Sequence, residues 1–247
     1  MLAVERVSKR FGGLRAVHEA SLTIENGRIT AVIGPNGAGK TTLFALITGF
    51  LTPTGGRIVY NGADITGIPT HRLARQGIAR TFQIVQPFAG LTVLENIAVG
   101  AHLHIAGRIE ALAAAAEVAK LVGLEPMLQQ PAAILTVAGR KRLELARALA
   151  TSPKLLLLDE VLAGLNPSEI RDMVPIIRAI RERGVTIMMI EHVMQAVMSL
   201  AQQIYVLVEG QVIAQGPPAQ VAADPKVIEA YLGAGAAARL AGGAHVH

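Results

Sequence analysis

The sequence predicts an α/β protein: a mostly parallel β-sheet with helices, an antiparallel β-subdomain at the N-terminus and an inserted α-helical subdomain. Three apolar segments of strand length end at polar residues, which is typical of buried parallel strands. These segments are residues 28–33, 155–158 and 185–190. The alternating residues 58–60 precede the turn pair Asn61-Gly62, as in antiparallel hairpins. Alanine-rich helical segments such as residues 110–121 then replace the strand pattern and indicate the insertion.

These patterns predict one domain over residues 1–232. We expect its core to comprise residues 1–86 and 151–232, and its helical subdomain to span about residues 87–150. The remainder, residues 233–247, is a Gly/Ala-rich C-terminal tail.

Helix signals are clear between the second and third apolar strands. Asn166 can cap a helix that starts at Pro167, and Gly184 can end it. The segment therefore predicts the order strand, helix, strand.

Composition excludes several classes of protein. The 247 residues are 51% hydrophobic with a net charge of +5, which excludes a disordered chain. The absence of cysteine excludes disulfide frameworks and thiolate metal or redox chemistry. Five Phe, three Tyr and no Trp argue against a protein that stacks nucleic-acid bases. No apolar run reaches the roughly 18 residues of a membrane span, and no signal peptide is visible. We therefore expect a cytosolic protein. If it functions at a membrane, a partner must anchor it there.

Residues 34–41 match the phosphate-binding loop pattern GxxxxGK[ST] at every fixed position, between a predicted strand and a predicted helix. Glycines let backbone N–H groups close around phosphates, and the helix N-terminus adds partial positive charge. Lys40 would reach the β- and γ-phosphates, and the Thr41 hydroxyl could bind Mg²⁺. Pattern and context together disfavour the alternative, a glycine-rich turn that merely caps a helix. The predicted nucleotide-binding residues of this loop are Gly34, Pro35, Asn36, Gly37, Ala38, Gly39, Lys40, Thr41 and Thr42.

An Asp-Glu pair ends the second apolar strand. Asp159 follows four leucines, as expected of an aspartate that holds Mg²⁺ at the end of a central strand. Glu160 lies one residue further and could accept a proton from an attacking water. An Asp-Glu pair also occurs at simple solvated strand ends, but the phosphate loop favours the functional interpretation.

Four further polar residues are weaker candidates. His192, at the end of the third strand, could contact the γ-phosphate or orient the water, although a lone histidine is commonly structural. Gln83 could offer its side-chain oxygen to Mg²⁺ and the water. The pair His102 and His104 lacks further ligands at a usable spacing, so we interpret it as surface residues.

In this order and spacing, the phosphate loop, the Gln after Arg-Thr-Phe, the Leu-Leu-Leu-Leu-Asp-Glu strand and the later Glu-His resemble the ATP-binding subunits of ABC transporters. The resemblance covers about residues 2–233. Finer matches resemble the ATPases of branched-chain amino-acid importers, in which the chain continues beyond the core with a similar ending. They lie at residues 10–17, 46–50, 164–167, 190–192 and 224–233.

The resemblance implies ATP and Mg²⁺ as cofactors and assigns two more residues to the nucleotide. Phe11 would stack on adenine, and Val17 would pack against the same ring. It also implies that Gln83 and residues 84–88 face membrane subunits and couple ATP binding to transport. The implied partners are a second ABC ATPase, two transmembrane permease subunits and, indirectly, a periplasmic or extracellular substrate-binding protein. The implied location is the cytoplasmic face of the cell membrane.

The signature segment departs from the family pattern. ABC ATPases act as head-to-tail pairs, in which each nucleotide meets the partner's Leu-Ser-Gly-Gly-Gln signature. The aligned residues here are Leu135, Thr136, Val137, Ala138 and Gly139. Thr136 keeps a hydroxyl for the γ-phosphate, whereas Val137 and Ala138 add Cβ atoms where glycines normally approach it, and Gly139 lacks the usual amide. The in-trans residues implied by the family are therefore Thr136, Ala138 and Gly139, in altered form.

Two interpretations of this departure stay open: a tolerated subfamily variant, or one member of an asymmetric heterodimer. Two further departures are Asn166, where many members have Asp although the branched-chain group has Asn, and Val193, where Asp is common. The leading function is an ATPase that drives import of branched-chain or other hydrophobic amino acids. The alternatives are urea or amide uptake, lipopolysaccharide export, and a soluble ABC ATPase without a membrane partner.

Overall fold

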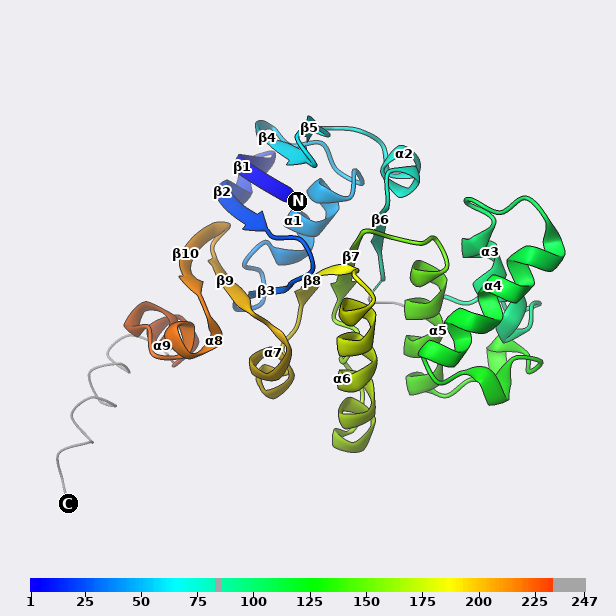
Figure 1. Ribbon diagram of the computed structural model, residues 1–247. Coiled ribbons are helices and arrows are strands. Elements are labelled where there is room, and N and C mark those ends of the chain that lie inside the picture. The colour runs from blue at the N-terminus through cyan, green and yellow to red at the C-terminus, as the bar shows by residue number, and fades with distance from the viewer. Residues whose placement is uncertain (83–85, 233–247) are drawn as a thin grey trace, which may run out of the picture.

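The computed structural model describes residues 1–82 and 86–232, and places a six-stranded sheet at the centre of the molecule (Figure 1). Five strands, β3, β6, β7, β8 and β9, run parallel to one another. The sixth, β10, pairs antiparallel with β9. The spatial order is β10 (Gln211–Gly216), β9 (Gln203–Val208), β3 (Ile29–Ile33), β8 (Thr186–Ile190), β7 (Leu155–Asp159) and β6 (Ile78–Arg80). The mostly parallel sheet predicted from the sequence is confirmed.

A second, antiparallel sheet covers one side of this centre (Figure 1). Its order is β2 (Leu14–Ile24), β1 (Leu2–Phe11), β4 (Gly55–Tyr60) and β5 (Ala63–Asp64). Asn61 and Gly62 join β4 to β5 with φ angles of 50° and 83°, the left-handed conformations that a two-residue hairpin turn requires. The predicted antiparallel N-terminal sheet is therefore confirmed.

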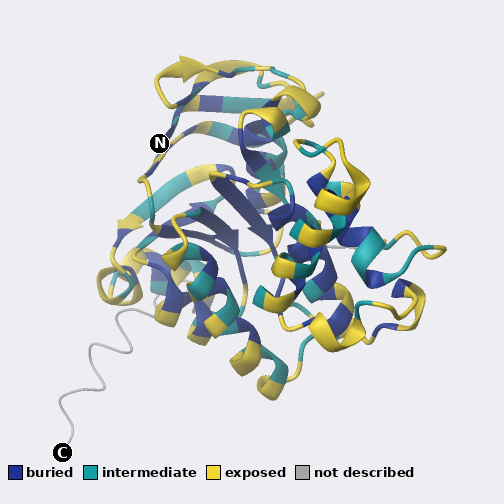
Figure 2. Ribbon diagram, turned by 45° about the vertical axis from the view of Figure 1, so that its right-hand side comes forward, coloured by how far each residue is buried: buried dark blue, intermediate teal, exposed yellow. Residues whose placement is uncertain are grey.

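The leucines of β7 divide between two hydrophobic cores, because successive side chains of a strand point to opposite faces. Leu155 and Leu157 pack with α1 (Lys40–Ile47) and the antiparallel sheet. Leu156 and Leu158 belong to the core on the other face, which includes residues of α6 (Pro167–Glu182) and α7 (Met194–Leu200). The inner strands β3, β7 and β8 are accordingly buried on both faces, and Figure 2 shows dark strands at the centre of the molecule.

Helix α6 begins where the sequence predicts. The Asn166 side chain accepts hydrogen bonds from the N–H groups of Ser168 and Glu169, and the Glu169 carboxylate accepts one in return from the Asn166 N–H. Gly184, at φ 90°, follows the helix end. This reciprocal capping fixes the connection between β7 and β8.

The region between β6 and β7 is helical. Helix α3 (Val93–Ala101) packs against α4 (Arg108–Leu121) and α5 (Val137–Leu149), with two short 3₁₀ helices, Glu125–Met127 and Ala132–Ile134, between α4 and α5. The remaining helices are α2 (Thr70–Arg75), α8 (Pro218–Ala222) and α9 (Pro225–Leu232). No helix in the described ranges combines the length and apolar character needed to cross a bilayer.

Candidate functional site

The ends of β3, β8 and β7 lie side by side at one edge of the central sheet. In the register, Ile190 of β8 is paired with Val32 of β3 on one side and with Asp159 of β7 on the other. The three polar strand ends therefore lie together, which brings the phosphate loop, the Asp-Glu pair and His192 to one edge of the sheet.

The phosphate loop connects β3 to α1, and two of its glycines, Gly34 and Gly39, could not carry a side chain without displacing backbone. A Cβ atom on Gly34 would lie 1.9 Å from the carbonyl oxygen of Leu207, and one on Gly39 would lie 2.2 Å from that of Ala16. Gly39, at φ 97°, is followed directly by the first turn of α1, whose free N–H groups open toward the loop. The backbone thus has the geometry expected of an anion-binding cradle.

The Lys40 side chain lies inside this cradle and is almost fully buried. Its Nζ donates hydrogen bonds to the carbonyl oxygens of Gly34, at 2.8 Å, and Pro35, at 2.9 Å. Burial lowers the pKa of the Lys40 ammonium, and the carboxylates of Glu160 and Asp159 oppose that shift. The cation is thereby held next to the space where phosphates would lie.

A cavity of about 700 Å³ opens over the loop. Its wall comprises Phe11, Leu14, Arg15, Ala16, Asn36, Gly37, Ala38, Gly39, Lys40, Thr41, Thr42, Glu160, His192 and Glu209. Phe11 is half exposed and lies under the Lys9 ammonium, 5.3 Å from Nζ to the ring centroid. Val17, which the family resemblance places beside the same ligand ring, is fully buried in the core and does not line the cavity, and Ala16 occupies that part of the wall.

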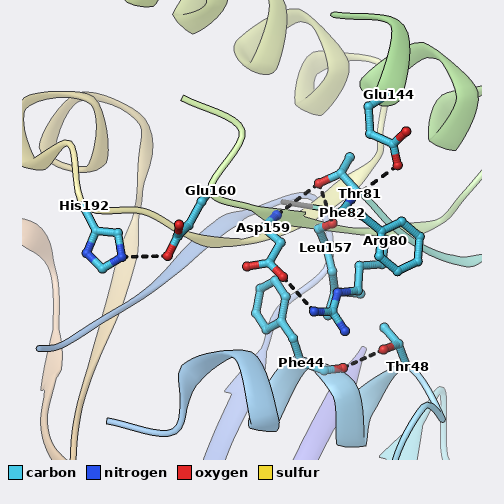
Figure 3. A network of polar contacts seen from close by, with 10 residues as sticks. All are labelled: Phe44, Thr48, Arg80, Thr81, Phe82, Glu144, Leu157, Asp159, Glu160 and His192. Atoms are coloured by element: carbon cyan, nitrogen blue, oxygen red, sulfur yellow. Dashed lines mark hydrogen bonds and ion pairs between the residues drawn. The ribbon is translucent and has the colours of Figure 1, made fainter. Parts of the chain in front are cut away.

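Glu160 and His192 face one another across the strand ends (Figure 3). The His192 Nε2 and the Glu160 Oε1 are 2.7 Å apart. Glu160 has a φ of 49°, a left-handed conformation that costs energy for a residue with a side chain. Its backbone is held on both sides, because its N–H donates to the Ile190 carbonyl and its carbonyl accepts from Lys141 Nζ. The carboxylate is therefore fixed at the cavity wall.

Asp159 is buried and forms an ion pair with Arg80, with 2.6 Å between Oδ2 and Nη2 (Figure 3). It lines a neighbouring cavity of about 470 Å³, and Thr41 lines both this cavity and the first. Within the described ranges no cluster of three or more His, Cys, Asp or Glu side chains could hold a metal. One carboxylate and one hydroxyl suit Mg²⁺, which keeps several waters and takes its other ligands from phosphates.

The other candidate residues lie elsewhere. Gln83 and residues 84–85 fall outside the described residues. His102 and His104 are exposed, and His102 Nδ1 contacts the Ile105 carbonyl.

Thr136 caps α5 by accepting from the Gly139 N–H at 3.2 Å, while Val137 is exposed. A Cβ atom on Gly139 would lie 3.3 Å from the Leu135 side chain, so the family's usual glutamine would be tightly packed there.

Sequence reasoning gave Glu191 no role, although it precedes His192. The Glu191 carboxylate is buried and accepts the Leu162 N–H at 2.9 Å. Burial raises the pKa of Glu191 to about 7, despite hydrogen bonds from backbone N–H groups and the nearby charge of Lys141. The raised pKa means that the folded protein holds a proton there that the unfolded chain releases near pH 4.5.

We expect Glu191→Gln to stabilise the protein at high pH only. For wild type, the stability contributed by the protonated carboxyl is complete below pH 4.5 and is lost as the pH rises to about 7, by roughly 3 kcal/mol at 1.36 kcal/mol per pKa unit. Glutamine keeps the Leu162 hydrogen bond without the charge. Urea unfolding at pH 5 and pH 8 measures the effect, with the exposed Glu182→Gln as the control. An equal gain at both pH values would contradict the assignment.

Comparison with known proteins gives a consistent match. A family model described as ABC transporter matches residues 17–163, and one described as branched-chain amino acid ATP-binding cassette transporter matches residues 211–237. The chain is 42% identical to the high-affinity branched-chain amino acid transport ATP-binding protein BraF of Pseudomonas aeruginosa and 39% identical to LivG of Escherichia coli. Each alignment covers 94% of this chain and 98% of the relative. A crystal structure of a nucleotide-free ATP-binding cassette from an ABC transporter superposes with a TM-score of 0.86 at 32% identity, covering 94% of this chain and 98% of that one.

Proposed function

The chain belongs to the ABC transporter family of ATP-binding proteins, and from that premise we propose that it energises an importer of branched-chain or other hydrophobic amino acids. Membership makes it an ATPase coupled to transport. The observation that carries the substrate class is the match of residues 211–237 to a model specific to branched-chain amino-acid cassettes. Near-complete alignment with BraF and LivG supports it, because both proteins are named for that transport.

We assign the nucleotide to the larger cavity. The phosphate loop would surround the phosphates, Lys40 would contact the β- and γ-phosphates, and Phe11 would stack on the base, with Val17 supporting this wall from the core. Bound Mg²⁺ would neutralise developing charge on the phosphates, and Thr41, Asp159 and Gln83 are its proposed ligands. Thr41 lines both cavities, which supports this arrangement.

Glu160 is the proposed general base. Its carboxylate lies at the cavity wall, fixed by a strained backbone and by His192, so it can receive the proton of a water that attacks the γ-phosphate. His192 would orient Glu160 and contact the γ-phosphate. Lys40 would stabilise charge on the leaving phosphates.

We propose that the working unit is a pair of ATPase chains on the cytoplasmic face of the membrane, docked on two permease subunits. Thr136, Ala138 and Gly139 would then face the partner's nucleotide. The division into a core of residues 1–86 and 151–232 and a helical subdomain of residues 87–150 belongs to this proposal, with Gln83 and the following segment directed toward the permease. The packing of α3, α4 and α5 on one another supports that division.

The test is an affinity pull-down of Glu160→Gln with MgATP from solubilised membranes of the source cell. We expect two multi-span membrane proteins, and a second ATPase if the dimer is asymmetric. The associated binding protein is then screened against leucine, isoleucine, valine, urea and amides. Recovery of only ribosomal or DNA-associated partners would refute the transport function, and tight binding of urea alone would refute the substrate class.

A further inference from the structure

Arg80 lies in a cage of aromatic rings. Its guanidinium carbon is 5.9, 5.8 and 5.7 Å from the ring centroids of Phe44, Phe50 and Phe82. These are three of the five phenylalanines of the chain. Phe50 and Phe82 also meet edge to face, with 5.6 Å between their centroids. Aromatic faces attract a guanidinium and remove it from water, so the cage holds the Arg80 charge in one place.

Asp159 is the group that neutralises this charge. The Arg80 and Asp159 side chains are only 9% and 3% exposed, and 2.6 Å separates Nη2 from Oδ2. The Arg80 Nε is buried and has no hydrogen-bond partner among the described residues, so the guanidinium depends strongly on this carboxylate. In a poorly solvated ion pair, loss of either charge leaves the other uncompensated.

The same carboxylate is the one assigned above to Mg²⁺. A guanidinium and a divalent cation would have to share one small buried carboxylate, whose Oδ2 already accepts from Arg80. Both cations would be close to each other in a region of low solvent access, where like charges repel strongly. The geometry therefore favours exchange of one cation for the other.

We propose that Arg80 is a resident counterion of Asp159 that competes with Mg²⁺, so that metal binding in the nucleotide site displaces the Arg80 guanidinium. This inference rests on the proposed role of Asp159 in Mg²⁺ binding. Arg80 acts on the metal through Asp159 and is therefore a positioning residue. Without bound metal, Arg80 keeps the Asp159 carboxylate oriented and neutralised. Because the metal must displace Arg80 from Asp159, the strength of this ion pair lowers the affinity for Mg²⁺.

Displacement of Arg80 from Asp159 would also affect residues outside the metal site. Arg80 ends β6 and is followed at once by Thr81 and Phe82, and the Phe82 ring is part of the cage. The Phe82 N–H donates to the Glu144 carboxylate of α5 at 3.3 Å, as Figure 3 shows. Displacement of Arg80 would therefore act on a segment held between the central sheet and α5, immediately before Gln83.

Arg80→Met tests the proposal, because methionine keeps the length and apolar contacts of the side chain without its charge. The measurement is the affinity for fluorescent mant-ADP in EDTA and in saturating Mg²⁺, from which the metal-dependent gain in affinity is calculated. We expect this gain to be about tenfold larger in Arg80→Met than in wild type, equivalent to about 1.4 kcal/mol. Arg75→Met, an exposed arginine on α2, is the matched control and should leave the gain unchanged.

A second variant keeps the proposal testable if Arg80→Met does not fold. Phe50→Leu removes one half-exposed ring and keeps both charges, so it should increase the metal-dependent gain a few-fold in the same direction. An unchanged or smaller gain in Arg80→Met overturns the proposal while leaving the Mg²⁺ assignment intact. If Arg80→Met does not bind mant-ADP at all, an unchanged gain in Phe50→Leu overturns it. If neither wild type nor Arg80→Met shows a metal-dependent gain, the proposed role of Asp159 fails as well.

Discussion

Replacing Glu160 by glutamine is expected to lower kcat for MgATP hydrolysis by about 10²- to 10⁴-fold and to leave ATP affinity nearly unchanged. Glutamine has the same shape and can keep a hydrogen bond to His192, which lies 2.7 Å from the carboxylate. It cannot accept a proton from the attacking water. Phosphate release under saturating ATP measures kcat, and equilibrium binding of a fluorescent ATP analogue measures affinity.

Glu209→Gln is the matched control for this experiment, because Glu209 is another carboxylate on the wall of the same cavity. Glu209 is exposed and forms no hydrogen bond or ion pair with His192 among the described residues, so the kcat of the variant should remain within a factor of about two of wild type. Substantial hydrolysis by Glu160→Gln would remove Glu160 as the main base. An equal loss in both variants would show that the cavity responds to net charge rather than to one positioned carboxylate.

Replacing Lys40 by methionine is expected to weaken ATP binding by about 10- to 100-fold, the usual value of one charge-assisted hydrogen bond. The lysine is already buried and held by the Gly34 and Pro35 carbonyls, so little further ordering is needed for it to contact phosphate. Methionine fills the same space without the charge. Isothermal titration with MgATP measures the loss.

The control for Lys40→Met is Lys154→Met, an exposed lysine that does not line the cavity. The substitution also removes the hydrogen-bond donor of the Gly34 and Pro35 carbonyls, which can lower stability. Thermal unfolding of Lys40→Met without nucleotide must therefore be recorded as well. If the variant binds MgATP as tightly as wild type, Lys40 only stabilises the loop through the Gly34 and Pro35 carbonyls, and its proposed contact with the phosphates is wrong.

Sequence patterns predicted the strands that carry the phosphate loop, Asp159 and His192, because each is a continuous apolar run with a polar end. The same reasoning identified neither β6 nor the pair β9 and β10. Strand β6 has only three residues and one fully buried side chain, Ile78, so it carries little periodicity. Its existence depends on pairing with β7, where Arg80 lies opposite Leu157.

The contacts of Arg80 and Glu191 could not be read from the sequence for the same reason. Arg80 and Asp159 are 79 positions apart and meet only because β6 adds to the edge of β7. The raised pKa of Glu191 comes from burial by several elements, which no local pattern encodes. Val17 shows the converse: the family resemblance names the position, while the alternation of β2 places its side chain in the core.

Among the described residues, helices α3, α4 and α5 contribute nothing to the wall of the larger cavity. The outer surfaces of α3 and α4 can therefore diverge during evolution without altering the residues proposed to hold nucleotide. Helix α5 is more constrained, because Ala138 and Gly139 are proposed to face the partner's nucleotide. Its Lys141 also donates to the Glu160 carbonyl, and its Glu144 accepts from the Phe82 N–H. A lineage could therefore change the exposed side chains of α3 and α4 while the residues of the cavity wall stay the same.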